Sequence, residues 1–525
     1  MNNAATSHNE IHRKRLFIGI CLALVPTGAS FALVANVLGQ LKAEFLLTNF
    51  QVGSIAGAGL WGMAISLLIL GPWLEKYGMK NGTLVAFLGH VVGLTLMIAA
   101  VALRGDPSAY WLLMLGAICL AVGNGMIEVT GNPLTTALYP DDKTAKLNWF
   151  HAFFPLGILA ASLIGFGLNQ LADVAPFFYH WTFQLGIVYI PIIIYGILVL
   201  PQKFPKTEYG ESGLPFGEMF RYALTHPLMY VLVLMLAVAV SIELGASRWI
   251  PEIFAQLGLH GILLLAWLSL LMVLLRLYAS PFVEKFSPPG MLCVGGAIKG
   301  TGLVLFAIAE GGFTAFLAAT FFGIGVAFFF PTIVGLVSER LPRAGSFGII
   351  LTMGVGLLAA GAVGTPGIGW IADTQLARYM DERHPEETIE VLRDVQDAFP
   401  ALIEEAEAAT DEELLALGFR AADLEAAMRA SQEALADYEE RGAIEGAAVP
   451  TALRAIVDAP VDHPVIERAA NIIGPAEGWG GQRALMFIAP LTLILIGVFG
   501  AMYINDQRKG GYKAEKLSAA TTPDE

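Results

Sequence analysis

Charged residues are scarce in this sequence of 525 residues. Asp, Glu, Lys and Arg together make up 14% of the chain, whereas an ordinary soluble domain holds about 25%. Hydrophobic residues make up 56%, and they recur in runs of roughly 20 residues, the length that a helix needs to cross a bilayer. The composition therefore excludes an ordinary soluble domain and predicts a helical membrane protein.

Cysteine and the motifs of cofactor chemistry are also scarce. Cys21, Cys119 and Cys293 all lie in apolar runs, where they are expected to pack as small hydrophobic side chains rather than form a disulfide framework. The sequence contains no Cys/His spacing typical of a metal site and no Walker-type phosphate loop. We therefore expect no enzyme, no metal, no cofactor and no direct use of ATP by this chain.

Acidic charge is confined to one segment. The formal net charge is -14. Residues 373–483 hold 25 acidic and 9 basic residues, a net charge of -16, which leaves +2 for the rest. The overall acidity is therefore local and indicates no nucleic-acid partner.

Twelve apolar spans are predicted, in two groups of six. They cover roughly residues 16–38, 52–74, 83–103, 110–138, 148–171 and 181–200, then 227–250, 258–280, 289–309, 312–337, 345–371 and 484–504. A basic cluster before the first span also fits a signal peptide, but the apolar run continues past the candidate cleavage site, so we expect an uncleaved span.

The sequence repeats itself at an offset of 209 residues. The segment Gly71–Asn81 (GPWLEKYGMKN) is echoed by Ser280–Gly290 (SPFVEKFSPPG). Two parallel repeats imply a pseudo-twofold axis along the membrane normal, with a solute site between the halves at mid-depth.

These observations predict the organisation of the chain. It comprises a cytoplasmic tail (1–15), an N-terminal six-helix bundle (16–200), a cytoplasmic linker (201–226), helices 7–11 of a C-terminal bundle (227–371), an acidic helical insert on the periplasmic side (372–483), helix 12 (484–504) and a cytoplasmic tail (505–525). The orientation follows from Lys and Arg, which gather in the inner segments, whereas the short outer loops offer little beyond Lys42 and Arg104. We expect a multi-pass protein of a bacterial-type inner membrane with both termini in the cytoplasm.

The insert carries a helix-start signal. Thr410–Glu413 matches a capping box and opens an apolar-periodic run to about Glu440. We expect two or three amphipathic helices that form a cap, with solute capture or partner docking as the alternative.

Polar residues inside the apolar runs gather between Gly123 and Gly157. Asn124, Glu128 and Asn132 lie four residues apart, so a helix places them on one face. A charged group at the centre of a membrane helix costs at least ~2.5 kcal/mol and normally faces a partner or a watery cavity. Burial favours the neutral carboxyl, which can load and release a proton, so Glu128 is the predicted proton-coupling residue. The alternative is a structural hydrogen bond across a tight helix interface.

The predicted solute-binding residues share amide, imidazole or carboxyl side chains within apolar spans. They are Asn36, Gln40, Asn124, Asn132, Asn148, His151 and Glu243. For Glu243 the alternative is a salt bridge with Arg248 or with another span, and for His151 it is packing. Lys299 is expected to snorkel or to pair with an acid, Arg276 to act as a structural or gating partner, and His90 to pack.

Several segments resemble a known family. Gly71–Lys80 resembles the loop motif of the major facilitator superfamily, with Glu75 in place of the usual Asp. The resemblance implies a gating or structural role for Gly71, Glu75, Lys76, Gly78 and Lys80, and the internal repeat extends that role to Glu284 and Lys285.

A narrower resemblance involves the polar cluster. Leu47–Gly53, the run from Glu128 to Pro133, Leu147-Asn148 and His151–Gly157 resemble the fucose/galactose/glucose–proton symporter subfamily. That resemblance implies that Glu128 takes part in proton coupling. The subfamily's second important acid lies on the first span, where this sequence has Ala35, and the subfamily has no counterpart of the insert.

The sequence thus predicts an all-α membrane protein of twelve helices in two pseudo-symmetric bundles, with an extramembrane helical insert. We expect a secondary transporter that takes up a monosaccharide or a similar small polar solute with protons, by alternating access, working as a monomer in the lipid bilayer. The alternatives are a uniporter or sodium-coupled carrier, and a transporter-fold receptor that docks a partner on the insert. Drug efflux fits the polar lining less well.

Overall fold

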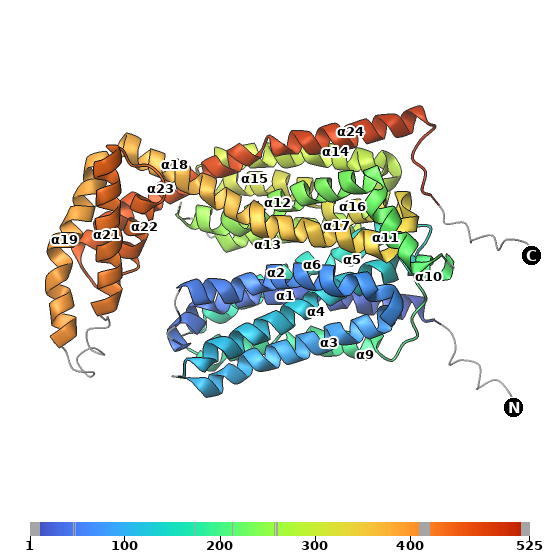
Figure 1. Ribbon diagram of the computed structural model, residues 1–525, viewed down its shortest axis with the longest axis horizontal. Coiled ribbons are helices and arrows are strands. Elements are labelled where there is room, and N and C mark those ends of the chain that lie inside the picture. The colour runs from blue at the N-terminus through green and yellow to red at the C-terminus, as the bar shows by residue number, and fades with distance from the viewer. Residues whose placement is uncertain are drawn as a thin grey trace, which may run out of the picture.

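The computed structural model describes residues 11–515, apart from residues 46, 48, 105, 173, 213, 257, 259–260 and 409–420. Every regular element in the described part is a helix. Two bundles lie side by side, and a smaller group of helices projects from one end (Figure 1). The predicted all-α class is confirmed.

The N-terminal bundle is built from the first 200 residues. Its helices are α1 (Arg13–Phe45), α2 (Asn49–Leu70), α3 (Leu74–Ala99), α4 (Ser108–Leu138), α5 (Lys143–His151), α6 (Phe153–Asn169), α7 (Pro176–Tyr179), α8 (Trp181–Gly186) and α9 (Tyr189–Val199). The linker to the second bundle forms α10 (Glu208–Ser212) and α11 (Phe216–Thr225).

The C-terminal bundle repeats this arrangement. Its helices are α12 (Pro227–Gln256), α13 (Gly261–Leu277), α14 (Ala279–Ala307), α15 (Gly312–Val326), α16 (Phe329–Arg340), α17 (Gly345–Ala359), α18 (Thr365–Arg383), α23 (Pro464–Ile488) and α24 (Leu491–Arg508). Ten stretches of the described chain are long and apolar enough to cross a membrane. One of them, Ser54–Leu103, holds both α2 and α3, and the apolar part of α13 is shorter, so the number twelve stays a prediction.

The internal repeat has a backbone counterpart. Gly78 in α3 has φ 79° and ψ 153°, and Ser287 in α14 has φ 57° and ψ 161°. Both residues interrupt an otherwise helical segment, and they are separated by the same offset that relates the two sequence motifs. The two halves therefore share a kink at equivalent positions.

Glycines let the helices of the N-terminal bundle approach closely. A Cβ atom on Gly28 of α1 would lie 2.1 Å from the Phe154 carbonyl oxygen, and one on Gly157 of α6 would lie 2.4 Å from that of Val25. Small residues at such crossings allow backbone-to-backbone packing in a membrane. This contact fixes the segment of α1 that lines the central pocket.

The insert forms a cap, which comprises α19 (Pro385–Ala408), α21 (Ala421–Arg441) and α22 (Ala448–Val457). Its apolar core, with Val391 and Phe399 among its residues, continues into α18 and α23. The predicted boundaries at 371/372 and 483/484 lie within α18 and α23, so unbroken helices join the cap to the C-terminal bundle. The capping-box motif at Thr410–Glu413 lies outside the described residues.

The cap and the chain ends lie at opposite ends of the molecule. The beginning of α1 and the end of α24 are on the right in Figure 1, and the cap is on the left. We call these the terminal end and the cap end. Large hydrophobic side chains are exposed over both bundles, but none is exposed among the described residues between Trp370 and Met486. This contrast is expected if lipid surrounds the bundles and water surrounds the cap.

Candidate functional site

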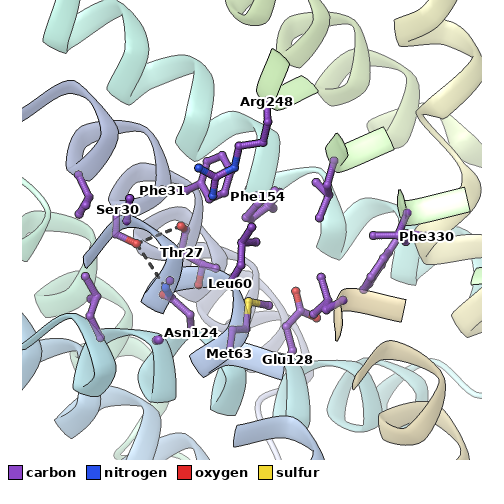
Figure 2. A pocket seen from close by; sticks show the side chains of 18 of the residues that line it. Thr27, Ser30, Phe31, Leu60, Met63, Asn124, Glu128, Phe154, Arg248 and Phe330 are labelled. Carbon is purple, nitrogen blue, oxygen red and sulfur yellow. Dashed lines mark hydrogen bonds between the residues drawn. The ribbon is translucent and has the colours of Figure 1, made fainter. Parts of the chain in front are cut away.

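A central pocket lies between the two bundles. It encloses about 1010 Å³ of space free of protein atoms, part of it continuous with the surroundings. Its charged and polar lining residues are Thr27, Ser30, Asn124, Glu128, His151, Glu243, Arg248 and Arg276. Phe31, Phe154 and Phe330 are among its apolar lining residues (Figure 2). A mostly apolar wall with a few convergent polar groups is typical of a small-molecule site.

Glu128 faces this pocket from α4. Asn132, one turn further on, donates from Nδ2 to Glu128 Oε2 at 2.8 Å and to the Glu128 carbonyl oxygen at 2.8 Å. His151 Nε2 lies 2.8 Å from Asn132 Oδ1 and 3.9 Å from Glu128 Oε2. All three side chains are buried. Asn132 thus connects the predicted polar face of α4 to His151 of α5, the next helix of the same bundle.

Arg276 of α13 links this cluster to the C-terminal bundle. Its Nη1 donates to the His151 carbonyl oxygen at 2.9 Å, and its Nε donates to the Ala327 carbonyl oxygen at 2.5 Å. Its Nη2 lies 3.6 Å from Glu243 Oε1. The chain of contacts from Glu128 to Glu243 therefore crosses from one bundle to the other.

Glu243 pairs with another span, one of the two alternatives left open by the sequence. Its partner is Arg276 rather than Arg248, and among the described groups its Oε2 has no hydrogen-bond partner. Lys299 lies deeper, where Nζ donates to the Ala239 carbonyl oxygen at 2.8 Å and sits 4.5 Å from the centre of the Phe329 ring. Lys299 is not part of the pocket lining.

Three of the predicted solute-binding residues, Asn124, His151 and Glu243, line the pocket, and so does the predicted proton-coupling residue Glu128. Asn124 is oriented by His90, whose Nε2 is 3.0 Å from Asn124 Oδ1 and whose Nδ1 is 3.0 Å from the Tyr195 hydroxyl. His90 thus has the packing role expected of it.

The other predicted solute-binding residues lie outside the pocket lining. Asn36 bonds to Asn169 and Gln184, and Gln40 donates to the Tyr179 carbonyl oxygen at 3.1 Å, all within the N-terminal bundle. Asn132 acts through Glu128 and His151, as described above. Asn148 donates to Thr332 Oγ1 at 3.1 Å across the bundle interface.

Sequence reasoning missed part of the pocket wall. Thr27, Ser30, Phe31 and Val34 of α1 are spaced as one helical face and all line the pocket. Ser30 Oγ donates to the Thr27 carbonyl oxygen at 3.1 Å, and Asn124 Nδ2 lies 3.4 Å from Ser30 Oγ (Figure 2). That spacing was the available signal, although hydroxyl residues are ordinary in membrane helices.

Contacts between the bundles close the terminal end. Glu339 Oε1 accepts from the Thr144 backbone N–H at 3.1 Å and from Thr144 Oγ1 at 2.7 Å. The Tyr512 hydroxyl donates to the other oxygen of Glu339. Burial, and then the charge of Glu339, raise the pKa of Tyr512 well above its usual value, so this phenol stays protonated. Lys143 of the N-terminal bundle forms an ion pair with Glu208 of the linker.

The residues of the loop motif lie at the same end. A Cβ atom on Gly71 would lie 2.4 Å from Ile350 of the C-terminal bundle, and Glu75 accepts from Thr207 Oγ1 at 2.5 Å. Lys76 Nζ lies over the Trp73 and Phe216 rings, at 4.7 and 4.6 Å from their centres. Gly78 supplies the kink, and Lys80 is exposed.

The repeated motif of the second half also lies at the terminal end. Glu284 and Lys285 line a second pocket there, together with Glu339 and Tyr512. In the described part of the chain, no group of three His, Cys, Asp or Glu side chains could hold a metal ion.

Two related helical bundles around a central pocket with a few convergent polar groups, closed at one end, are the architecture of a membrane transporter. The chain belongs to the Major Facilitator Superfamily, whose sequence profile matches residues 18–373. The family predicted from the loop motif is confirmed, and members of this family are transporters rather than enzymes.

Among curated proteins, the chain is similar to the L-fucose-proton symporter of Escherichia coli K12, with 23% identity over 376 residues, covering 64% of this chain and 82% of the relative. It is also similar to the class E tetracycline resistance protein of Escherichia coli, with 22% identity, covering 59% of this chain and 76% of the relative.

Solved structures show the same fold. The transporter FucP in its outward conformation matches with a TM-score of 0.56 and 20% identity, over 68% of this chain and 92% of that one. The proton:xylose symporter XylE matches with a TM-score of 0.55 and 15% identity, over 66% and 86%. A bacterial homologue of the lysosomal transporter Spinster matches with a TM-score of 0.54 and 15% identity, over 93% and 98%.

Proposed function

We propose that this transporter takes up a small polyhydroxylated solute together with protons, and that Glu128 carries the proton. One observation carries the proposal: a buried carboxyl lines the central pocket and is linked, through Asn132 and His151, to Arg276 of the opposite bundle. A change of charge on Glu128 is therefore felt at the interface that must move. The similarity to the L-fucose-proton symporter and to XylE supports a sugar-like solute.

The proposed cycle begins with the pocket open toward the cap end. Protonation removes the negative charge of Glu128, and the neutral carboxyl can then donate a hydrogen bond to a solute oxygen. Hydroxyl groups of the solute find further partners in Ser30 and Asn124. When the bundles rock about the filled site, the bonds of Thr144 to Glu339 and of Asn148 to Thr332 must break to open the terminal end. Loss of the solute and the proton then resets the pocket.

We further propose that the terminal end faces the cytoplasm of a bacterial-type cell. The basic residues of the short loops support this orientation, which places the cap on the outer side of the membrane. The acidic surface of the cap is then in contact with water rather than lipid.

Proton coupling is tested in liposomes with an inward proton gradient. Wild-type protein should accumulate sugar, whereas Glu128→Gln should lose accumulation and keep exchange of labelled for unlabelled solute, because only the proton-carrying step is removed. Glu310→Gln is the matched control, since Glu310 is exposed in a loop. Accumulation by Glu128→Gln at the rate of the control would remove Glu128 from the coupling role.

The second candidate is a uniporter or a sodium-coupled carrier. The observation that favours it is Ala35 on α1, at the position where the symporter subfamily has its second acid. Replacing the proton gradient by a sodium gradient in the same liposomes separates the candidates: a sodium-coupled carrier accumulates solute only with sodium, and a uniporter accumulates with neither.

A further inference from the structure

Arg248 of α12 is a cation in the pocket wall, and none of the described side chains provides a counter-ion for it. Its guanidinium lies 4.2 Å from the centre of the Phe31 ring, which belongs to α1 of the opposite bundle (Figure 2). Its Nε is buried and has no hydrogen-bond partner within the described part of the chain. Among the side chains that the structure describes, no carboxylate pairs with it, because Glu243, five residues earlier, pairs with Arg276.

Two other buried cations of the C-terminal bundle, Arg276 and Lys299, have partners. Arg276 donates to two carbonyl oxygens and faces Glu243, and Lys299 donates to a carbonyl oxygen and lies on an aromatic ring. Buried polar groups are nearly always paired, so an unpaired one in a pocket calls for an explanation. Arg248 lines the pocket, and its Nε is a charged donor left unpaired among the described residues.

The charges of the pocket wall point the same way. Arg276 and Glu243 offset each other. With Glu128 protonated, Arg248 leaves an excess of one positive charge in the wall. A neutral sugar would leave this charge uncompensated in a poorly solvated site, which is costly. A solute with one carboxylate would neutralise it, and a guanidinium can bind a carboxylate with two parallel hydrogen bonds.

The remaining polar groups suit the rest of such a solute. Thr27 Oγ1 is buried without a hydrogen-bond partner among the described groups, and it lies beside Ser30 and Asn124 on the wall that Figure 2 shows below Phe31. Hydroxyl and amide groups recognise alcohol groups rather than further charges. Phe31 meanwhile packs against the guanidinium, whose carbon lies 4.2 Å from the ring centre.

We propose that the solute is a polyhydroxy monocarboxylate, such as an aldonate or a uronate, whose carboxylate binds Arg248. This inference rests on the proposed function for the location of the site, and it specifies the class of solute. A phosphate monoester is less suitable, because it brings nearly two negative charges at neutral pH to an excess of one positive charge.

The test measures binding without any ion gradient. Purified full-length protein is titrated with D-gluconate, D-glucuronate, D-glucose, sorbitol and D-glucose 6-phosphate, and the melting temperature is recorded, since a ligand of the folded state raises it. The two acids should raise the melting temperature of wild-type protein well above the neutral compounds and the phosphate ester. Arg248→Gln should weaken acid binding roughly 10- to 100-fold, the range expected for a lost charged hydrogen bond.

Two further variants make the result interpretable. Arg248→Lys keeps the positive charge but cannot form the two parallel hydrogen bonds of a guanidinium, so it should bind the acids with intermediate affinity. Arg508→Gln removes an exposed arginine at the end of α24 and should bind them like wild type. The proposal is overturned if neutral sugars or the phosphate ester stabilise the protein more than the acids, if neither acid shifts the melting temperature, or if Arg248→Gln weakens acid binding no more than Arg508→Gln.

The outcome is separable from that of proton coupling. If binding of the acid depends on Arg248, but Glu128→Gln accumulates the acid as well as wild type does, this inference is upheld and the coupling role of Glu128 is refuted. Accumulation of neutral sugar that depends on Glu128, without acid binding, would do the reverse.

Discussion

Arg276 is the residue on which the two halves of the site depend most directly. Its three donors reach a carbonyl oxygen of its own bundle, a carbonyl oxygen of the other bundle and the carboxylate of Glu243. It is buried, as is Glu243. Desolvation makes such a pair a weak source of net stability, but removing one partner leaves a charge stranded in a medium that cannot solvate it.

Removal of the arginine charge alone should therefore be more harmful than removal of the pair. Arg276→Gln should lower the stability of the protein by about 3–5 kcal/mol, and the double variant Arg276→Gln/Glu243→Gln should recover part of that loss. Thermal unfolding of wild type, Arg276→Gln, Glu243→Gln and the double variant in one detergent measures these differences in stability. If the double variant is no more stable than Arg276→Gln, the two side chains do not form an energetically coupled pair.

At the scale of elements, the shared kink of α3 and α14 is the clearest trace of the internal repeat. A backbone with positive φ is accessible to glycine, whereas other residues adopt it at a cost of about 1–3 kcal/mol. The first half has Gly78 at the kink, and the second half has Ser287, which is the single non-glycine residue with positive φ in the described chain. The second half thus holds the same bend in a strained conformation.

Exchanging the two residues tests this reading of the kinks. Gly78→Ser should destabilise the protein by about 1–2 kcal/mol, and Ser287→Gly should be neutral or stabilising by up to about 1 kcal/mol, because relief of strain is partly offset by the entropy of glycine in the unfolded chain. Melting temperatures of the two variants and of wild type provide the comparison. Destabilisation of similar size in both variants would mean that the Ser287 side chain, not the strain, governs that kink.

The helical period predicted which residues share one face of a helix, but it did not predict what that face contacts. Spacing placed Asn124, Glu128 and Asn132 together on α4, as the structure has them. The same spacing placed Asn36 and Gln40 together, but their face turns toward amides of the N-terminal bundle. A helical period shows which residues share a side and carries no information about the neighbour on that side.

Contacts between spans that are distant in the sequence could not be predicted for a related reason. Glu243 meets Arg276 because α12 and α13 cross at that level, and Arg248, which is nearer in sequence, turns to Phe31. The boundaries of the cap could not be predicted from the sequence either. Composition changes at residue 372, but the helix that begins at Thr365 continues to Arg383, since one helix can pass from an apolar to a watery environment without breaking its backbone hydrogen bonds.

For the whole molecule, alternating access requires the terminal end to separate in each cycle. Gly335 of α16 and Thr144 of α5 meet there, and a Cβ atom on Gly335 would lie 3.1 Å from the Cβ of Thr144. That separation is just below the usual ~3.5–4.5 Å between the Cβ atoms of a disulfide. A covalent link at this point would hold the two bundles together where they have to part.

The variant Gly335→Cys/Thr144→Cys should therefore lose transport on oxidation and regain it on reduction. Solute exchange in liposomes, before and after treatment with a mild oxidant and then a reductant, measures the effect. The two single-cysteine variants control for the native Cys21, Cys119 and Cys293. Undiminished exchange in a fully cross-linked sample would show that transport proceeds without separation at this contact.

The continuous helices α18 and α23 have a mechanical consequence. Because both cross from the C-terminal bundle into the cap without a joint, the cap must turn as a rigid lever whenever that bundle tilts. A small rotation of the C-terminal bundle then becomes a larger displacement of the acidic cap. A fluorophore at its tip would read out each turnover from the water side.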